Sequence, residues 1–307
     1  MEDIRTGEHP QVLLVGNGIN MAFHDPSWEN LVKDELAFSK SDLTYEEIQS
    51  IPATMQIVLA TNDHVDDRLK SMTCALEKQE ITGERKAFLT DLLELPMDAV
   101  LTTNYSFELE RAAGFDKSIA SYRRKLVRTK QETPSKDSFR LYQYYPLNHT
   151  SLWHIHGDIA KPNSMIMGHY YYGKLLRDIQ NYVALFMHDY HDAASRGIAY
   201  KPKSWVDYFL LGDVYIIGLG LYLCEADLWW LLCCKKRNFP ETKIYYYGEL
   251  RKTDERRLLL EVYCGKIIDE IRLKRDQNGN TDCAKFQTFY RQGFCSIAEE
   301  SKKNRDR

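Results

Sequence analysis

Four segments of this sequence place glycine or polar residues directly after an apolar run. They are Gly16-Asn17-Gly18, Thr103-Asn104, His156-Gly157-Asp158 and Gly218-Leu219-Gly220. Glycine permits positive φ and lets a phosphate approach backbone N–H groups. An asparagine amide both donates and accepts hydrogen bonds, and a histidine exchanges protons near neutral pH. These residue types predict a nucleotide site with a capacity for acid–base chemistry.

The elements that must position these segments are predicted strands. The apolar runs end at Val15, Thr102, Ile155 and Ile217. A strand followed by a polar turn and a helix forms the edge at which α/β sheets bind ligands, and the turns of parallel strands open on the same edge. We therefore predict an α/β fold with a doubly wound, mostly parallel Rossmann-like sheet, whose strand ends form one crevice.

We predict one Rossmann-like domain over residues 1–298, followed by a charged tail at 299–307 that is expected to be disordered. Helical insertions are expected at about residues 39–95 and 114–150. The first insertion is amphipathic and should cover one side of the sheet. A terminal helix is predicted at about residues 283–297.

Composition and charge favour a cytoplasmic protein. The 307 residues carry a formal net charge of −3, so bulk attraction to nucleic acid or an anionic membrane is not expected. The most apolar stretch, 214–224, is too short to cross a bilayer, and the N-terminus does not resemble a signal peptide. The basic run at 123–125 is interpreted as a solvated loop. Seven cysteines without a C-x-x-C pair predict reduced, mostly buried thiols.

The order of these segments resembles the sirtuin-like superfamily, specifically the zinc-free bacterial branch of NAD hydrolases found in antiphage defence. The resemblance covers roughly residues 11–250. It is carried by GNGIN, SWENLV, TTNY, HIHGD and IIGLGLYLCEADLWWLL, in that order. It implies an enzyme that cleaves NAD to nicotinamide and ADP-ribose as the effector of an abortive-infection system. NAD is then the substrate, and no cofactor or metal is expected.

The resemblance assigns the catalytic pair to Asn104 and His156. It implies dinucleotide contacts from Gly16, Asn17, Gly18, Asn20, Thr103, Ser106, Gly157, Gly218, Leu219 and Gly220. An amide at position 104 would fix a water or a ribose hydroxyl near the anomeric carbon, and the imidazole at 156 would accept its proton. Nicotinamide leaves as a neutral group from a cationic ring, so positioning matters more than acid assistance.

Two departures from the family pattern refine this prediction. The deacylating sirtuins carry a four-cysteine zinc module, and its absence here favours hydrolysis over protein deacylation. Ser106 replaces an aspartate, and a hydroxyl is a weaker acceptor for the nicotinamide carboxamide. About 60 residues follow the resembling region, too few for a typical sensor domain. We therefore predict control by a separate sensor protein or by homo-oligomerisation.

Other functions remain open. A regulatory subunit would bind NAD or a related nucleotide in the same pocket without cleaving it. A dehydrogenase is a third possibility, but Met21 replaces the last glycine of G-x-G-x-x-G, and no acidic residue stands at 36–40 to bind a ribose.

Individual residues also have structural interpretations. His154 and His156 lie two apart, on one face of a strand, which is how some metal sites begin, although His154 alone fits a hydrogen-bonded core histidine. Asn104 alone fits a strand-to-helix turn. Glu225 and Asp227 are expected to cap the following helix, with Glu225 within reach of a ribose.

Overall fold

A computed structural model describes residues 3–5, 7–23, 28–77, 81, 83–115, 125–126, 139–147, 149–263, 266–268, 270–274 and 282–306. Within them, eight strands form a sheet in the order β3-β4-β5-β2-β1-β6-β7-β8. The strands are β1 (Gln11–Val15), β2 (Ala99–Thr102), β3 (Lys125–Leu126), β4 (Gln143–Pro146), β5 (Ser151–His154), β6 (Asp213–Ile217), β7 (Ile244–Tyr247) and β8 (Lys266–Ile268).

The sheet is mostly parallel. At one edge, β3 pairs with β4 and β4 pairs with β5 in antiparallel orientation, and the remaining neighbouring strands pair in parallel. Counted along the chain, the parallel strands lie in the order 3-2-1-4-5-6, which is the order of the doubly wound dinucleotide-binding fold. The predicted fold class is confirmed.

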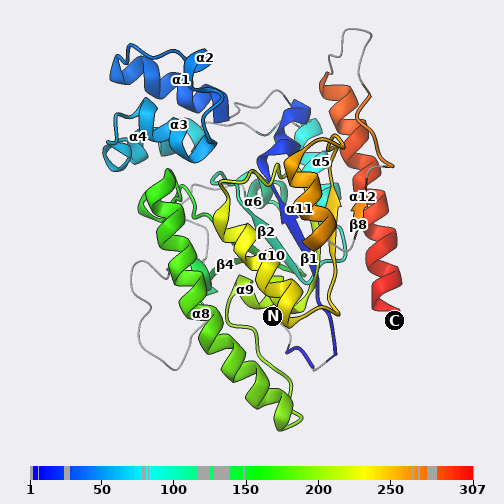
Figure 1. Ribbon diagram of the computed structural model, residues 1–307. Helices are drawn as coiled ribbons and strands as arrows, with labels where there is room; N and C mark the ends of the chain where they lie inside the picture. The colour runs from blue at the N-terminus through cyan, green and yellow to red at the C-terminus, as the bar shows by residue number, and fades with distance from the viewer. Residues whose placement is uncertain are drawn as a thin grey trace.

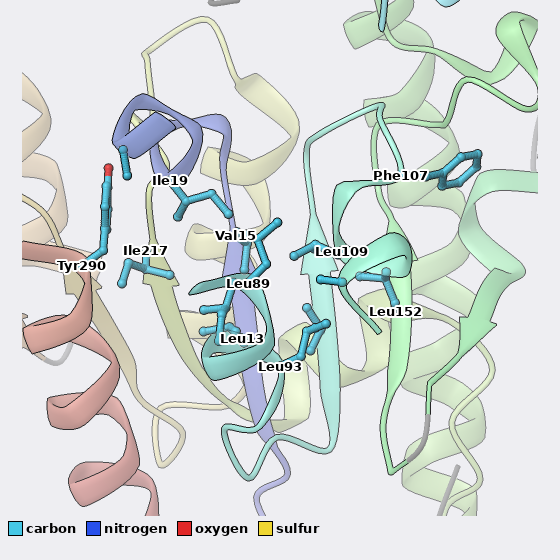
Figure 2. Packing of buried hydrophobic residues seen from close by; sticks show 14 of the residues in the cluster. Leu13, Val15, Ile19, Leu89, Leu93, Phe107, Leu109, Leu152, Ile217 and Tyr290 are labelled. Atoms are coloured by element: carbon cyan, nitrogen blue, oxygen red, sulfur yellow. The ribbon is translucent and has the colours of Figure 1, made fainter. Parts of the chain in front are cut away.

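Helices cover both faces of the sheet. They are η1 (Asn17–Phe23), α1 (Trp28–Ser39), α2 (Tyr45–Ile48), α3 (Ala53–Ala60), α4 (Val65–Glu77), α5 (Gly83–Leu93), α6 (Glu108–Ala112), α7 (Phe139–Tyr142), η3 (Pro162–Ser164), α8 (His169–Ser195), α9 (Trp205–Leu211), α10 (Ala226–Asn238), α11 (Glu255–Tyr263) and α12 (Cys283–Arg305). Leu13 and Val15 of β1 pack into the core with α5, α6 and α12, as Figure 2 shows. Val12 and Leu14 pack into the core on the other face, with α8, α9 and α10. A strand buried on both faces requires the unbroken apolar run that the sequence carries here.

The first insertion is helical, but its placement differs from the prediction. Phe88 and Leu92 of α5 join the core on one face of the sheet. In contrast, α3 and α4 of the insertion, together with the preceding α1, lie beyond the carboxyl ends of the strands (Figure 1). There, Trp28, Thr54 and Leu76 line a cavity. The expectation that the whole insertion covers one side of the sheet is therefore wrong, and part of it forms a wall of the ligand crevice.

The second predicted insertion is described only in part, because 116–124 and 127–138, with Arg123 and Arg124 of the basic run, lie outside the described residues. The described part supplies α7 and the strands β3 and β4, so a purely helical insertion is the wrong description of it. The residues of β4 alternate between buried and half-buried, and its tyrosines favour a strand.

The charged C-terminal segment is helical rather than disordered. α12 continues through Arg305. Asn304 Nδ2 donates to the Tyr215 hydroxyl at 2.8 Å, and Arg305 Nη2 donates to the Pro96 carbonyl at 2.7 Å. Basic residues in the last turn also interact favourably with the helix dipole. These contacts anchor the tail to the rest of the fold. The prediction of a disordered tail is therefore wrong.

None of the helices in the described ranges combines the length and apolar character needed to cross a bilayer. Among the described cysteines, Cys234 alone is buried, so the prediction of mostly buried thiols is wrong. Cys233 precedes it on α10 and is half-buried, because adjacent residues of a helix point in different directions.

Candidate functional site

A cavity of about 180 Å³ lies at the carboxyl ends of β1, β2, β5 and β6. It is lined by Asn17, Trp28, Leu31, Ala53, Thr54, Leu76, Thr103, Asn104, Tyr105, Ser106, His156, Ile166, Gly168, Tyr172, Tyr222, Cys224 and Glu225. No lysine or arginine of the described chain is among these residues. Sites for drug-sized ligands usually measure roughly 300–1,000 Å³, so this cavity accommodates one end of a dinucleotide rather than all of it.

The structure brings the two predicted catalytic residues to this one cavity. Asn104 and His156 both line it, as do Asn17, Thr103 and Ser106 from the predicted contact set. The other predicted contacts are not part of the lining; they are Gly16, Gly18, Asn20, Gly157, Gly218, Leu219 and Gly220. The predicted site is therefore assembled in part.

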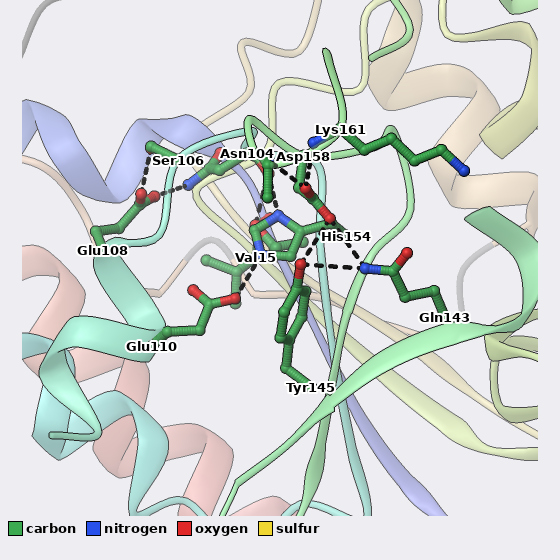
Figure 3. Close-up of polar contacts among 12 residues, drawn as sticks. Val15, Asn104, Ser106, Glu108, Glu110, Gln143, Tyr145, His154, Asp158 and Lys161 are labelled. Carbon is green, nitrogen blue, oxygen red and sulfur yellow. Dashed lines mark hydrogen bonds and ion pairs between the residues drawn. The ribbon is translucent and has the colours of Figure 1, made fainter. Parts of the chain in front are cut away.

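A buried carboxylate, Glu108, holds Asn104. It accepts hydrogen bonds from Asn104 Nδ2 at 2.7 Å and from the Ser106 hydroxyl (Figure 3). It also accepts from Asn20 Nδ2 at 3.3 Å. One N–H of the Asn104 amide is thus donated to the protein. Its Oδ1 is buried and has no partner within the described part of the chain. Asn104 therefore offers an acceptor to a ligand in the cavity.

Asn20 serves this network rather than the ligand. Its Nδ2 also donates to Asn17 Oδ1 at 2.7 Å, and its Oδ1 accepts from Arg85 Nη2 at 3.0 Å. Both amide hydrogens of Asn20 are used by these bonds and by Glu108. The predicted dinucleotide contact does not fit this geometry. Asn20 instead joins the turn after β1 to the carboxylate that holds Asn104.

The loops after β1 and β6 pack closely against each other, and this packing requires glycine at positions 16 and 18. The Gly16 N–H donates to the Ile217 carbonyl at 3.0 Å, and the Gly18 N–H donates to the Gly218 carbonyl at 2.6 Å. A Cβ at position 18 would lie 2.6 Å from the Gly218 oxygen and 2.9 Å from the Tyr290 hydroxyl. These N–H groups are not free for a phosphate, so the predicted contact through them does not fit the structure.

We expect Gly18→Ala to lower the free energy of unfolding by about 1–3 kcal/mol, because the added methyl group overpacks the two loops. The loss should be the same with and without NAD, as measured by urea unfolding. Gly83→Ala is the control, since a Cβ at position 83 meets no atom within 4 Å. An unchanged urea midpoint for Gly18→Ala would contradict the packing role.

Gly157 allows the chain to turn sharply after His156. Its φ is +84°, and a Cβ there would lie 2.1 Å from the Ser164 carbonyl oxygen. The neighbouring Asp158 accepts a hydrogen bond from the Tyr145 hydroxyl at 2.9 Å (Figure 3). The glycine thus serves the backbone that carries His156, and no contact of its own with the cavity is seen.

His156 is paired with a carboxylate that the sequence pattern assigned to helix capping. Its Nε2 lies 2.9 Å from Asp227 Oδ2, and the two side chains are 2% and 0% exposed. An ionised carboxylate only accepts, so Nε2 carries the proton and Nδ1 is the basic nitrogen. No described residue forms a hydrogen bond with Nδ1. The sequence signal that would have identified this partner is a carboxylate in the first turn of the helix that follows β6. That turn lies next to the point where the strand order of the sheet reverses.

Glu225 also lines the cavity and does not cap α10 with its side chain. Glu225 is the N-cap residue of α10, as predicted, but its Oε2 accepts from the Tyr222 N–H at 2.6 Å rather than from the helix. Burial raises the pKa of Glu225 to about 7; the nearby His156 opposes this rise and Asp227 adds to it. The site therefore contains a carboxyl group that changes charge near neutral pH.

This raised pKa predicts a pH dependence of stability. Below the ordinary pKa of 4.5, Glu225 is protonated in both the folded and the unfolded chain. As the pH rises to about 7, the unfolded carboxyl ionises first, so the folded state loses stability. The loss should be on the order of 3 kcal/mol by pH 8. Urea unfolding at pH 5 and pH 8 should show a smaller loss for Glu225→Gln than for wild type; equal losses would contradict this.

His154 is confirmed as a hydrogen-bonded core histidine. Its Nδ1 donates to the Asn104 carbonyl at 2.6 Å, and its Nε2 lies 2.7 Å from Glu110 Oε1 (Figure 3). Burial lowers the pKa of His154, but the charge and hydrogen bond of Glu110, the charge of Asp158 and the hydrogen bond to the Asn104 carbonyl together outweigh it and raise the pKa to about 9. A charged His154 holds the backbone at Asn104.

The two histidines do not form a joint metal site. His154 contacts Glu110 of α6, whereas His156 contacts Asp227 of α10, on the opposite face of the sheet. β5 ends at His154, so the alternation that would place both rings on one face stops there. Among the described residues, no group of three or more His, Cys, Asp or Glu is arranged to hold a metal ion.

No protein-family model matches the chain, and no curated protein matches its sequence. The site itself is therefore the basis for assigning a function. It consists of Asn104 held by Glu108 and His156 held by Asp227, on the wall of one small cavity.

Proposed function

We propose that this protein is an NAD glycohydrolase that cleaves NAD to nicotinamide and ADP-ribose. One observation carries the proposal: Asn104 and His156 come from turns after different strands, line one cavity, and are each hydrogen-bonded to a buried carboxylate. This arrangement supplies an acceptor and a base at a fixed place, which is what hydrolysis of a good leaving group requires.

The reaction uses these groups as follows. The bond between the ribose C1′ and the nicotinamide nitrogen breaks, and its electron pair neutralises the pyridinium ring. A water oxygen bonds to C1′, and His156 Nδ1 takes the proton of that water. The Asp227 carboxylate stabilises the imidazolium that forms, and the proton passes to solvent after the products leave. Asn104 Oδ1 accepts a hydrogen bond from the water or a ribose hydroxyl.

The walls of the cavity suit the nicotinamide end of the substrate. Trp28, Leu31 and Leu76 supply apolar surface for a flat ring. The Glu225 carboxyl group, when ionised, favours the positive charge of the intact pyridinium. In this proposal the phosphates and the adenosine lie outside the cavity, with the adenosine beside the Gly218-Leu219-Gly220 turn.

The biological role in the proposal is that of an effector in antiphage defence, and its support is the resemblance of the ordered motifs to that branch of the sirtuin-like superfamily. An uncontrolled NAD hydrolase would deplete the NAD of its own cell. We therefore include control by a separate sensor protein or by homo-oligomerisation in the proposal.

The test is nicotinamide release from NAD by the purified chain, alone and with the proteins encoded beside it. Asn104→Ala should lower the rate about 100-fold, because the acceptor that positions the water or ribose hydroxyl is lost. Asn181→Ala, on the exposed surface of α8, is the matched control. Absence of nicotinamide in every combination would contradict the proposal. Tight NAD binding without product would identify a regulatory nucleotide-binding subunit instead.

A further inference from the structure

The first turn of α3 lines the cavity with unused hydrogen-bond donors. Ala53 and Thr54, the first two residues of this helix, both belong to the lining. The first N–H groups of a helix have no acceptor within it. Met55 and Gln56 donate to the Pro52 carbonyl at 2.7 and 3.1 Å, but the N–H groups of Ala53 and Thr54 have no acceptor within the described ranges.

A second, independent feature points to a ligand at the same place. The Thr54 side chain is 3% exposed, and its hydroxyl oxygen is buried without a partner in the described part of the chain. A buried polar group without a hydrogen-bond partner destabilises the folded chain. Asn104 lines the cavity at the end of a strand, and its Oδ1 is likewise buried without a hydrogen-bond partner among the described residues. A bound molecule that meets both atoms would remove both penalties.

The start of α3 is held rigidly in place. The Gln56 side chain accepts from Trp28 Nε1 at 3.1 Å and donates to the Ile51 carbonyl at 2.8 Å. Gly168, with φ of +90°, lets α3 approach the start of α8, because a Cβ there would lie 3.1 Å from Val58 Cγ2. The donors of the first turn are therefore preorganised, as a specificity site requires.

The surroundings select a neutral acceptor rather than an anion. Backbone N–H groups and the positive end of a helix dipole favour an oxygen atom of the ligand. However, no described lysine or arginine lines the cavity, and Glu225 contributes a carboxyl group to it. Trp28 and Leu31 offer apolar surface in the same cavity as Thr54. The carbonyl of an amide attached to an aromatic ring meets all of these conditions.

We propose that Thr54 and the first N–H groups of α3 bind the carboxamide of the nicotinamide group, and so determine which leaving group the cavity accepts. This inference rests on the proposed function. The Ser106 hydroxyl, which the family pattern places at the carboxamide, already donates to Glu108. In this inference the carboxamide contact comes instead from Thr54, outside the turns that follow the strands. The helical insertion then supplies specificity, while the strand ends supply the chemistry.

The experiment compares Thr54→Val, Thr54→Ser and Thr61→Val in the full chain. Valine removes the hydroxyl with little change of shape, and serine keeps it. Thr61→Val is the matched control, because Thr61 is a buried threonine at the other end of α3 whose hydroxyl donates to the Ile57 carbonyl at 2.8 Å. Calorimetry measures the Kd of nicotinamide and of nicotinic acid, and steady-state kinetics measures KM for NAD. Thermal unfolding checks each variant.

Thr54→Val should weaken nicotinamide binding and raise KM for NAD about 10-fold, which corresponds to one lost hydrogen bond. Thr54→Ser and Thr61→Val should stay within about twofold of wild type, and nicotinic acid should bind more weakly than nicotinamide. Unchanged nicotinamide binding by Thr54→Val, in a chain whose wild type cleaves NAD, would overturn this assignment and leave the proposed function intact. Nicotinic acid binding as tightly as nicotinamide would overturn the choice of a neutral amide. A folded wild type that binds neither NAD nor nicotinamide would overturn both proposals.

Discussion

Asp227→Asn is expected to lower nicotinamide release about 100- to 10,000-fold, and His156→Ala is expected to do the same, because each removes the general base. The asparagine amide can donate to Nε2, which places the imidazole proton on Nδ1, the nitrogen that must accept it. The effect should fall on kcat, since Asp227 does not line the cavity and acts only through His156.

Kinetics and pH profiles of the folded variants measure this effect. Asp227→Asn should shift or abolish the acidic limb of the kcat profile, which a purely structural role would not do. Asp192→Asn is the matched control, because Asp192 is a half-exposed partner of Arg196 on α8 and is remote from the cavity lining. Full turnover by Asp227→Asn with normal thermal stability would refute the assignment of Nδ1 as the base.

Glu108→Ala is expected to lower the free energy of unfolding by about 3–5 kcal/mol, since it leaves several buried donors without an acceptor at roughly 1–3 kcal/mol each. The donors are the amides of Asn104 and Asn20 and the Ser106 hydroxyl. Glu108→Gln should cost less, because its amide oxygen still accepts from Asn104. Glu108→Ala also frees Asn104 to rotate, so nicotinamide release by this variant should fall together with its stability.

Urea unfolding followed by circular dichroism provides the measurement. Glu94→Ala, which removes an exposed carboxylate at the end of α5, is the control and should change stability by less than about 0.5 kcal/mol. If Glu108→Ala unfolded at the same urea concentration as this control, the three hydrogen bonds would contribute nothing to the fold, and the view of Glu108 as the residue that holds Asn104 would have to be abandoned.

The meeting of Asn104 and His156 in one cavity shows how much of the candidate site local sequence patterns can predict. Each follows a short apolar run that forms a parallel strand, and parallel strands end at one edge of the sheet. Knowledge of the strands alone therefore places both residues at the same edge. The C-terminal helix shows the opposite situation: α12 continues to Arg305, eight residues past the predicted end at about 297, because no glycine or proline follows to stop it.

The sequence by itself determined the fold class, the edge of the sheet at which the site lies, and the two residues placed there. Only the tertiary structure decided what holds and surrounds them. Asp227 stands 71 residues from His156, and no local period relates them. The wall formed by α3 depends on how the insertion docks, and the role of Gly18 depends on a loop about two hundred residues away. Such contacts join faces of elements that the chain brings together only on folding, so the spacing of residues along the sequence cannot encode them.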